Sequence, residues 1–206
     1  MKPFVRKLAA AVAVATLSVA AQAAPPSPYV IDPTQPVAGQ SQLELSQQWW
    51  QWVLGIPAAT NPISDGNGST AGVNNNGNVF FLAGNGGGAS TRTISVPEGK
   101  PIFFPILNNV YIFTPDAPLG EPSGTEACNQ ISEAERVQCA LPSINMAAIS
   151  DLNAQLDGAD LLTYPSYRQT SVSLFEVDLP GDNLFGLPLE GNPYAAVSDG
   201  YWVALA

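Results

Sequence analysis

Residues 96–108 read Val-Pro-Glu-Gly-Lys-Pro-Ile-Phe-Phe-Pro-Ile-Leu-Asn, a turn sequence followed directly by an apolar run. The Pro-Glu-Gly-Lys part is typical of a β-turn, and the apolar part at 102–107 predicts a strand. Pro105 has no N–H to donate to a sheet ladder, so it predicts either an edge strand or a bulge. After a bend at Asn108-Asn109, residues 110–113 extend the same strand.

Five further segments are short and rich in apolar or alternating β-prone residues, and they predict strands at 79–83, 91–96, 159–164, 171–177 and 201–205. Turn sequences lie between several of them, at Asp157-Gly158, at 180–183 and at Asp199-Gly200. The stretch 84–88 (Gly-Asn-Gly-Gly-Gly) predicts a hairpin connection, because it lacks a full dinucleotide-binding fingerprint and no helix follows it. Short strands with turn-rich links favour a mostly antiparallel β-sandwich or jelly-roll-like domain.

The first helix is predicted over 41–54 from signals at both of its ends. Ser41 with Glu44 three residues later is a capping box, in which each residue's side chain bonds the other's backbone N–H. Gly55 then provides the stop, and apolar residues between these points recur at helical spacing.

Two more helices are predicted in the middle of the chain. Ser132 with Glu135 is a second capping box and begins a helix that runs to about residue 141. Apolar residues at helical spacing predict a third helix over 143–156. The predicted fold class is therefore mainly β (α+β) with about three short helices. Its parts are an extended lead-in at 24–40 and a single β-rich domain at 41–206 with a helical insertion at about 130–157.

The first 23 residues have the three parts of a secretory signal peptide. Basic residues within 2–7 precede an apolar run at 8–20, and Ala21-Gln22-Ala23 is a cleavage site of the A-x-A type. The alternative is a membrane anchor, but the run is shorter than the roughly 20 residues of a spanning helix. Cleavage predicts a secreted or periplasmic protein without a membrane span. It leaves four basic residues against seventeen acidic ones, a net charge of −13.

Composition excludes several kinds of site. The sequence has 206 residues and no histidine, which excludes a Ser-His-Asp triad and a histidine-ligated zinc site within it. A net charge of −10 argues against nucleic acid as a partner, because phosphate binding needs a surplus of Lys and Arg. Cys128 and Cys139 are the only cysteines, and export favours a structural disulfide between them over a reactive thiol near Arg136.

Several of these segments carry a resemblance to a known group of proteins. Trp-Trp-Gln-Trp at 49–52, the stretch 96–108 and Asp-Gly-Tyr-Trp at 199–202 together resemble a functionally uncharacterised family of exported bacterial proteins. In that family the strand like 201–205 usually leads into a Pro/Gly turn and one more strand that carries a histidine. The resemblance implies that this chain is truncated at its C-terminus, so the absence of histidine describes this sequence alone. It implies no reaction.

The tryptophan cluster provides the first candidate binding residue. Trp49 and Trp52 fall on the apolar face of the predicted helix, whereas Trp50 points about 100° away from Trp49. An exposed Trp50 offers a flat apolar surface and one N–H to a sugar ring or to a partner. The alternative is that Trp50 packs beneath the turn-rich loop at 61–78.

Three further residues are candidate ligand-binding residues: Asn108, Arg168 and Asp182. Asn108 ends the 96–108 segment, and Asp182 is one of several turn carboxylates of which a glycoside hydrolase would need two at one cleft. Arg168 is one of the four basic residues left after cleavage, and it either clamps an anionic ligand or pairs with a buried acid.

Asp65, Asn67 and Ser69 are candidate calcium ligands. Their side-chain oxygens alternate along the chain as in the first half of a calcium loop. The bidentate acid of an EF-hand is absent, because Asn76 stands at its position. The alternative is a plain flexible loop, since Asp-Gly and Asn-Gly are turn formers.

Three functions fit these features. The favoured one is an exported non-catalytic β-sandwich domain that binds carbohydrate or a surface, with a polysaccharide as partner. The second is a structural or assembly protein of the cell envelope, which would use an open sheet edge to accept a partner strand. The third is a carboxylate-dependent polysaccharide hydrolase. The sequence leans towards a protein without enzymatic activity, and it indicates no cofactor other than calcium.

Overall fold

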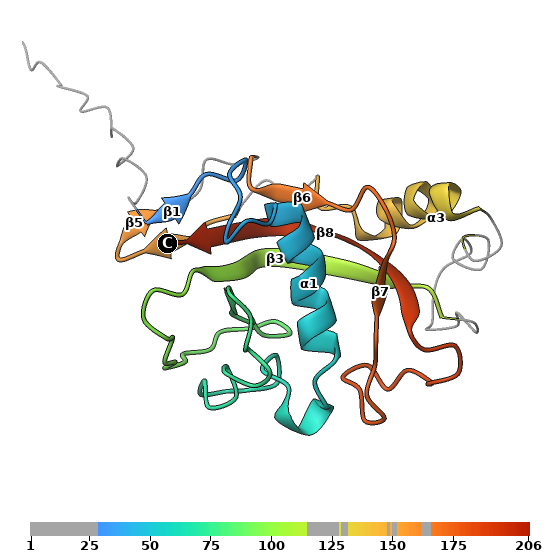
Figure 1. Cartoon of the computed structure of the whole chain (residues 1–206), viewed down its shortest axis with the longest axis horizontal. Helices are drawn as coiled ribbons and strands as arrows, with labels where there is room; N and C mark the ends of the chain where they lie inside the picture. The colour runs from blue at the N-terminus through green and yellow to red at the C-terminus, as the bar shows by residue number, and fades with distance from the viewer. Residues whose placement is uncertain (1–28, 115–127, 129–131, 148, 150–151, 162–165) are drawn as a thin grey trace, which may run out of the picture.

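The computed structural model describes residues 29–114, 128, 132–147, 149, 152–161 and 166–206. Over this part of the chain the protein is mainly β, with one mixed sheet of six strands, a separate two-stranded sheet and two α-helices (Figure 1). The strands of the main sheet are β1 (Val30–Ile31), β2 (Phe80–Phe81), β3 (Ile102–Ile112), β6 (Arg168–Thr170), β7 (Phe175–Val177) and β8 (Tyr194–Leu205).

Two long antiparallel strands, β3 and β8, form the middle of the main sheet (Figure 1). Along its other edge β8 pairs with β7, β6 and β1 in turn, all antiparallel. On its outer side β3 pairs with β2, and this pair is parallel. The predicted antiparallel arrangement therefore holds for every pair of this sheet except β2 with β3. The predicted strand at 201–205 is only the C-terminal part of β8.

A bulge in β3 sets the close contact between the two central strands. The register with β8 shifts between Pro105 and Leu107, which confirms the bulge that Pro105 predicts. A Cβ atom on Gly200 of β8 would lie 2.7 Å from Cβ of Asn108 and 2.9 Å from the carbonyl oxygen of Leu107. The prediction of a turn at Asp199-Gly200 is thus wrong. This glycine serves the close approach of two strands.

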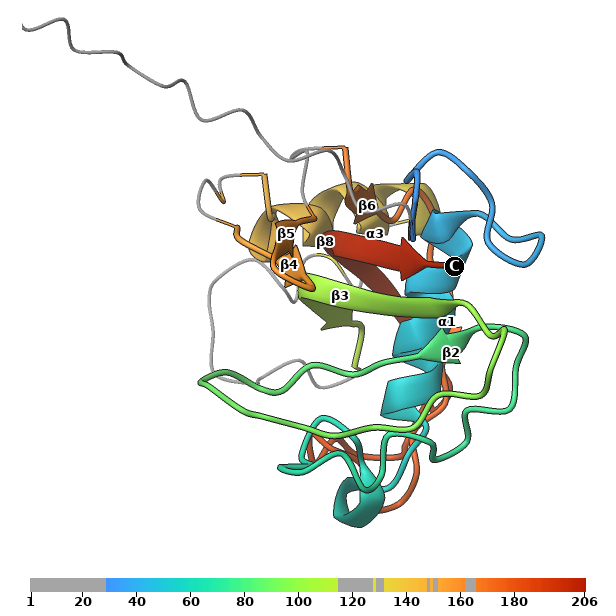
Figure 2. The ribbon, with the colours of Figure 1, turned by 90° about the vertical axis from the view of Figure 1, so that its left-hand side faces the viewer.

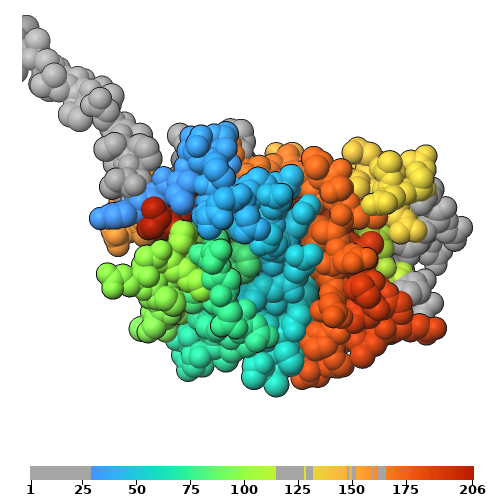
Figure 3. Space-filling view, in the orientation of Figure 1, coloured from blue at the N-terminus to red at the C-terminus, as the bar shows by residue number. Residues whose placement is uncertain are grey.

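Helix α1 (Gln42–Leu54) crosses one face of the sheet, here called the α1 face (Figures 1 and 2). Ser41 and Glu44 form the predicted capping box, and the N–H of Gly55 bonds the last turn, so both predicted ends are confirmed. The helix packs on the sheet through Trp49, whose ring meets that of Trp202 edge-on with centroids 5.4 Å apart. Figure 3 shows α1 (cyan) between loop residues coloured green and C-terminal residues coloured orange.

The opposite face of the sheet is covered by α3 (Glu133–Ala140), the 3-10 turn η2 (Leu141–Ile144) and the hairpin of β4 (Gln155–Leu156) with β5 (Ala159–Asp160) (Figure 2). The second capping box is present at the start of α3, as predicted. The third predicted helix, at 143–156, is wrong among the described residues. There the segment leaves η2 in extended backbone and ends in β4.

Side chains along β8 alternate between the two faces and divide the core. Trp202 and Ala204 pack under α1, and the ring of Trp202 stacks on that of Phe103 with centroids 5.3 Å apart. Val197 packs against α3, and Val203 packs against the β4–β5 side. The single strand β8 therefore contributes to both apolar layers.

Two local predictions near the glycine-rich stretch are wrong. Residues 91–96 are predicted as a strand, but they belong to no strand. Residues 84–88 consequently do not connect a hairpin, and β2 pairs instead with β3. The N–H of Thr93 is bonded to the carbonyl of Asn67, so loop-to-loop contacts replace the expected ladder.

Cys128 and Cys139 form the predicted disulfide, with their Cα atoms 5.5 Å apart. Both side chains lie in the apolar cluster between α3 and the sheet, together with Phe113 and Val137. The disulfide therefore fastens Cys128 to α3. No helix in the described part of the chain is long and apolar enough to cross a membrane.

We predict that Gly200→Ala lowers the free energy of unfolding by about 1–3 kcal/mol, the usual range for forcing a methyl group into a packed site. The matched control is Gly181→Ala, because a Cβ there has no neighbour within 4 Å. Urea unfolding of both variants measures the difference. Equal stability of the two variants would contradict the close approach of β3 and β8.

Candidate functional site

A pocket of about 430 Å³ lies on the α1 face, beside the bulge of β3. It is enclosed by one helix, one strand and three loops. The lining residues are Trp49 and Trp50 of α1, residues 105–108 of β3, residues 84–87, Ile63, and Leu184 with Phe185. None of these described lining residues carries a charged side chain. The pocket is thus mainly apolar, and its polar side chains are few.

Trp50 is buried in this pocket wall, with 5% of its surface exposed. The alternative of an exposed Trp50 is therefore wrong, and its burial agrees with the alternative of a packed Trp50. It is Trp52 that lies half-buried beneath the 61–78 loop, where its Nε1–H donates to the carbonyl of Val73 at 2.9 Å. The buried side of α1 includes Gln42 and Ser46. Because both are polar, the pattern of apolar residues in the sequence does not show which side of the helix is buried.

The indole N–H of Trp50 has no hydrogen-bond partner among the described residues. Its neighbours on the helix differ, because Trp49 donates to the carbonyl of Leu82 and Trp52 to that of Val73. A buried N–H without a partner lowers stability by about 1–3 kcal/mol relative to a bonded one. The lone donor of Trp50 therefore calls for an explanation.

The bulge of β3 places Asn108 on the α1 face, where it lines the same pocket as Trp50. Beyond the bulge, Val110 and Ile112 pack in the core under α1, and Asn108 shares their side of the strand. Its Nδ2 atom is buried and also has no partner among the described residues. Gln42 Oε1, Arg92 Nε and Trp202 Nε1 are likewise unpartnered, but these residues do not line the pocket.

Arg92 joins two of the loops that line the pocket. Its Nη1 donates to the carbonyls of Ala83 and Gly84, both at 2.9 Å, and its Nη2 donates to that of Ile63 at 3.3 Å. Within the glycine-rich stretch, the Asn85 side chain bonds the backbone of residues 87 and 88. The guanidinium group therefore holds the wall near Gly84 against the wall at Ile63.

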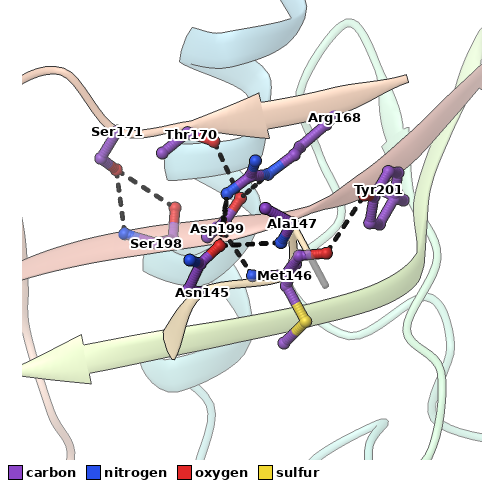
Figure 4. Close-up of polar contacts among 9 residues, drawn as sticks. All are labelled: Asn145, Met146, Ala147, Arg168, Thr170, Ser171, Ser198, Asp199 and Tyr201. Atoms are coloured by element: carbon purple, nitrogen blue, oxygen red, sulfur yellow. Dashed lines mark hydrogen bonds and ion pairs between the residues drawn. The ribbon is translucent and has the colours of Figure 1, made fainter. Parts of the chain in front are cut away.

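A second polar cluster lies on the opposite face of β8, around Asp199 (Figure 4). Its carboxylate accepts from Arg168 Nε at 2.9 Å and Nη2 at 2.6 Å, from Thr170 Oγ1 at 2.8 Å and from the N–H of Met146 at 2.8 Å. Arg168 also donates to the side chain of Asn145 at 3.0 Å. The cluster ties β6 and the segment after η2 to the middle of β8.

Asp199 is fully buried, and its pKa reflects two opposed effects. Burial by itself raises the pKa of this carboxyl, but the hydrogen bonds from Arg168, Met146 and Thr170 outweigh burial and hold the pKa below its ordinary value of 3.8. Arg168 pairs with a buried acid, as one of its two predicted alternatives states. Because Asp199 and Gly200 point to opposite faces of β8, this ion pair is separated from the pocket by the sheet.

The other candidate residues lie outside both clusters. Asp182 is exposed and does not line the pocket, although it precedes Leu184 by two positions. The carboxylate of Asp65 accepts hydrogen bonds from three backbone N–H groups and from the Thr70 hydroxyl, which lower its pKa to about 2. The side-chain oxygen of Asn67 accepts from the N–H of Ser69.

In the structure, the side-chain oxygens of Asp65 and Asn67 accept hydrogen bonds from the backbone of their own loop. Calcium binding by Asp65, Asn67 and Ser69 stays a prediction. Among the residues that the structure describes, no cluster of three or more acidic, cysteine or histidine side chains is close enough to hold a metal ion.

The structure thus brings together two of the four candidate ligand-binding residues, Trp50 and Asn108. Sequence analysis missed Ile63, Leu184 and Phe185, which line the same pocket. Phe185 is 46% exposed, and an aromatic residue between turn signals was the available hint. Comparison of the chain with protein-family models, curated proteins and solved structures finds no match.

We predict that Asp199→Asn lowers the free energy of unfolding by about 3 kcal/mol. This is the lower end of the range for breaking a buried ion pair, because the Arg168 side chain is 28% exposed and can reach water. The double variant with Arg168→Met is expected to lose less than the sum of the single changes. Urea unfolding of the single and double variants measures this coupling, and strict additivity would contradict it.

The same pair gives an expected pH dependence. The folded-state pKa of Asp199 lies below its ordinary value, so the unfolded chain takes up the proton first as the pH falls. The stabilisation is complete well above pH 3.8 and is lost progressively below it. Between pH 6 and pH 3, roughly, the unmodified protein is expected to lose more stability than Asp199→Asn. Parallel curves for the two proteins would contradict this role of the carboxylate.

Proposed function

We propose that the protein is an exported, non-catalytic domain that binds an uncharged carbohydrate in the pocket between α1 and β3. The observation that supports this most directly is that two residues lining one pocket, Trp50 and Asn108, each have a buried N–H donor (Nε1 and Nδ2) without a partner among the described residues. Pockets of this size are typical of small-ligand sites. Apolar walls with a few polar groups that fix orientation are also typical of such sites.

The chemistry of the lining favours a ligand rich in hydroxyl groups. Two N–H donors need acceptor oxygens, and the carbonyls of residues 84–87 offer acceptors to hydroxyl protons. The ring of Phe185, which is 46% exposed, provides a flat apolar surface that suits the C–H face of a sugar ring. A sugar presents all three kinds of group in one small molecule.

The charge distribution favours an uncharged ligand. The described lining contains no cation that would bind a carboxylate or phosphate. The protein as a whole is acidic, with a net charge of −10, so its field repels anions. Arg92 lies close by, but its guanidinium group is directed to three backbone carbonyls.

Export and family membership belong to the same proposal. The signal-peptide pattern at 1–23 and the disulfide between Cys128 and Cys139 support a secreted or periplasmic protein. The resemblance to a family of exported bacterial proteins and the β-sandwich arrangement stay predictions, as does a polysaccharide partner. No contact in the described residues specifically favours the envelope-assembly or hydrolase alternatives, which also stay predictions.

The test is calorimetric titration of the protein with uncharged tetrasaccharides of glucose, mannose or N-acetylglucosamine, with a uronic acid tetrasaccharide as the charged comparison. We expect one of the uncharged sugars to bind and to raise the thermal midpoint. Binding of the uronic acid sugar alone, or of none of the four, would overturn the proposal.

We predict that Trp50→Phe weakens binding of that sugar by about 2- to 10-fold, the effect of losing one net hydrogen bond of ~0.5–1.5 kcal/mol. The matched control is Trp52→Phe on the same helix, whose N–H is bonded to Val73 outside the pocket. That variant is expected to bind as tightly as the unmodified protein. If both variants bind equally, the indole of Trp50 does not contact the sugar.

A further inference from the structure

The glycines of the pocket wall are not explained by the protein's own packing. At Gly84, Gly86 and Gly87 an added Cβ would have no neighbour within 4 Å. Gly84 and Gly86 also lack the positive φ that would require glycine, although Gly87 has a φ of +124°. Glycine loses more conformational freedom on folding than other residues. At positions 84 and 86 it therefore lowers stability, and neither the backbone conformation nor the packing within the protein requires it.

A second observation in the same pocket points to a ligand. Trp50 is 95% buried, and its indole N–H has no hydrogen-bond partner among the described residues. Because this nitrogen and Nδ2 of Asn108 are covered in the free protein, a ligand oxygen reaches them only if part of the wall shifts slightly. Residues 84–87 are all exposed, and an added Cβ at Gly84, Gly86 or Gly87 would have no neighbour within 4 Å.

We infer that the backbone of residues 84–87 is the surface against which the bound sugar lies. The absence of side chains lets a ring approach the peptide groups directly, as glycine does wherever a backbone must come close to a ligand. The inference rests on the proposed function and adds which wall of the pocket contacts the ligand.

Residues 84–87 are held at both ends by hydrogen bonds, so their middle can shift while the ends stay in position. Arg92 fixes the carbonyls of Ala83 and Gly84 at its N-terminal end. At the other end, Asn85 bonds the carbonyl of Gly88 and the hydroxyl of Ser90. Between these two ends, a Cβ at Gly86 or Gly87 would have no packed neighbour, and the N–H of Gly87 donates to Oδ1 of Asn85. A small displacement there admits the sugar while the ends stay in place.

The test compares Gly86→Leu with Gly66→Leu. Both glycines have open space around the Cβ position and no positive φ, so both variants are expected to fold with the stability of the unmodified protein. Only Gly86 lines the pocket. We expect Gly86→Leu to weaken binding of the sugar at least about tenfold, which corresponds to ~1.4 kcal/mol, and Gly66→Leu to leave it unchanged.

Amide hydrogen exchange gives an independent measurement on the unmodified protein. Addition of the sugar is expected to slow exchange within residues 84–88, and exchange in the hairpin of β4 and β5, on the opposite face of the sheet, serves as the comparison. If Trp50→Phe weakens binding but Gly86→Leu does not, the pocket binds sugar and this inference is overturned. If the unmodified protein binds none of the sugars, the proposed function fails and the inference fails with it.

Discussion

The bulge between Pro105 and Leu107 brings β3 into close contact with Gly200 of β8, and the pocket owes the position of Asn108 to that bulge. Without the extra residue, the side chains beyond the bulge would exchange faces, since the period of a strand is two residues. Asn108 would then leave the α1 face and the pocket. A side chain larger than glycine at position 200 would force the two strands apart at the same point.

Asp199, the neighbour of Gly200, lies on the other face of β8 and forms the second polar cluster. Asp199 binds Arg168, Thr170 and the backbone of Met146, so one carboxylate fastens β6 and the segment after η2 to β8 (Figure 4). Arg168 is therefore a structural partner of a buried acid. The sheet separates this ion pair from the pocket, which lets substitutions in one be measured with little direct effect on the other.

Local signals made the ends of α1 predictable, and the cysteine count with the export signal made the disulfide predictable, whereas long-range contacts decided the rest. Ser41, Glu44 and Gly55 act within one helical turn of their own positions, and α1 begins and ends where they indicate. Asp199-Gly200 has the composition of a turn, but its pairing with Arg168 and Asn108 from distant segments makes it part of a strand. Likewise, Asn145 and Met146 bind this cluster instead of continuing a helix over 143–156.

The buried position of Trp50 could not be predicted for a related reason. Gln42 and Ser46 are polar but buried, because their side chains bond backbone carbonyls, and they shift the packed stripe of α1 toward Trp50. The N–H groups of the three tryptophans of the helix then have different surroundings: that of Trp49 donates to Leu82 and that of Trp52 to Val73, whereas that of Trp50 is covered and has no partner among the described residues. Backbone carbonyls pair two of these donors, so the unpaired third, in a residue that lines the same pocket as Asn108, is the observation on which the proposal of an oxygen-bearing ligand rests.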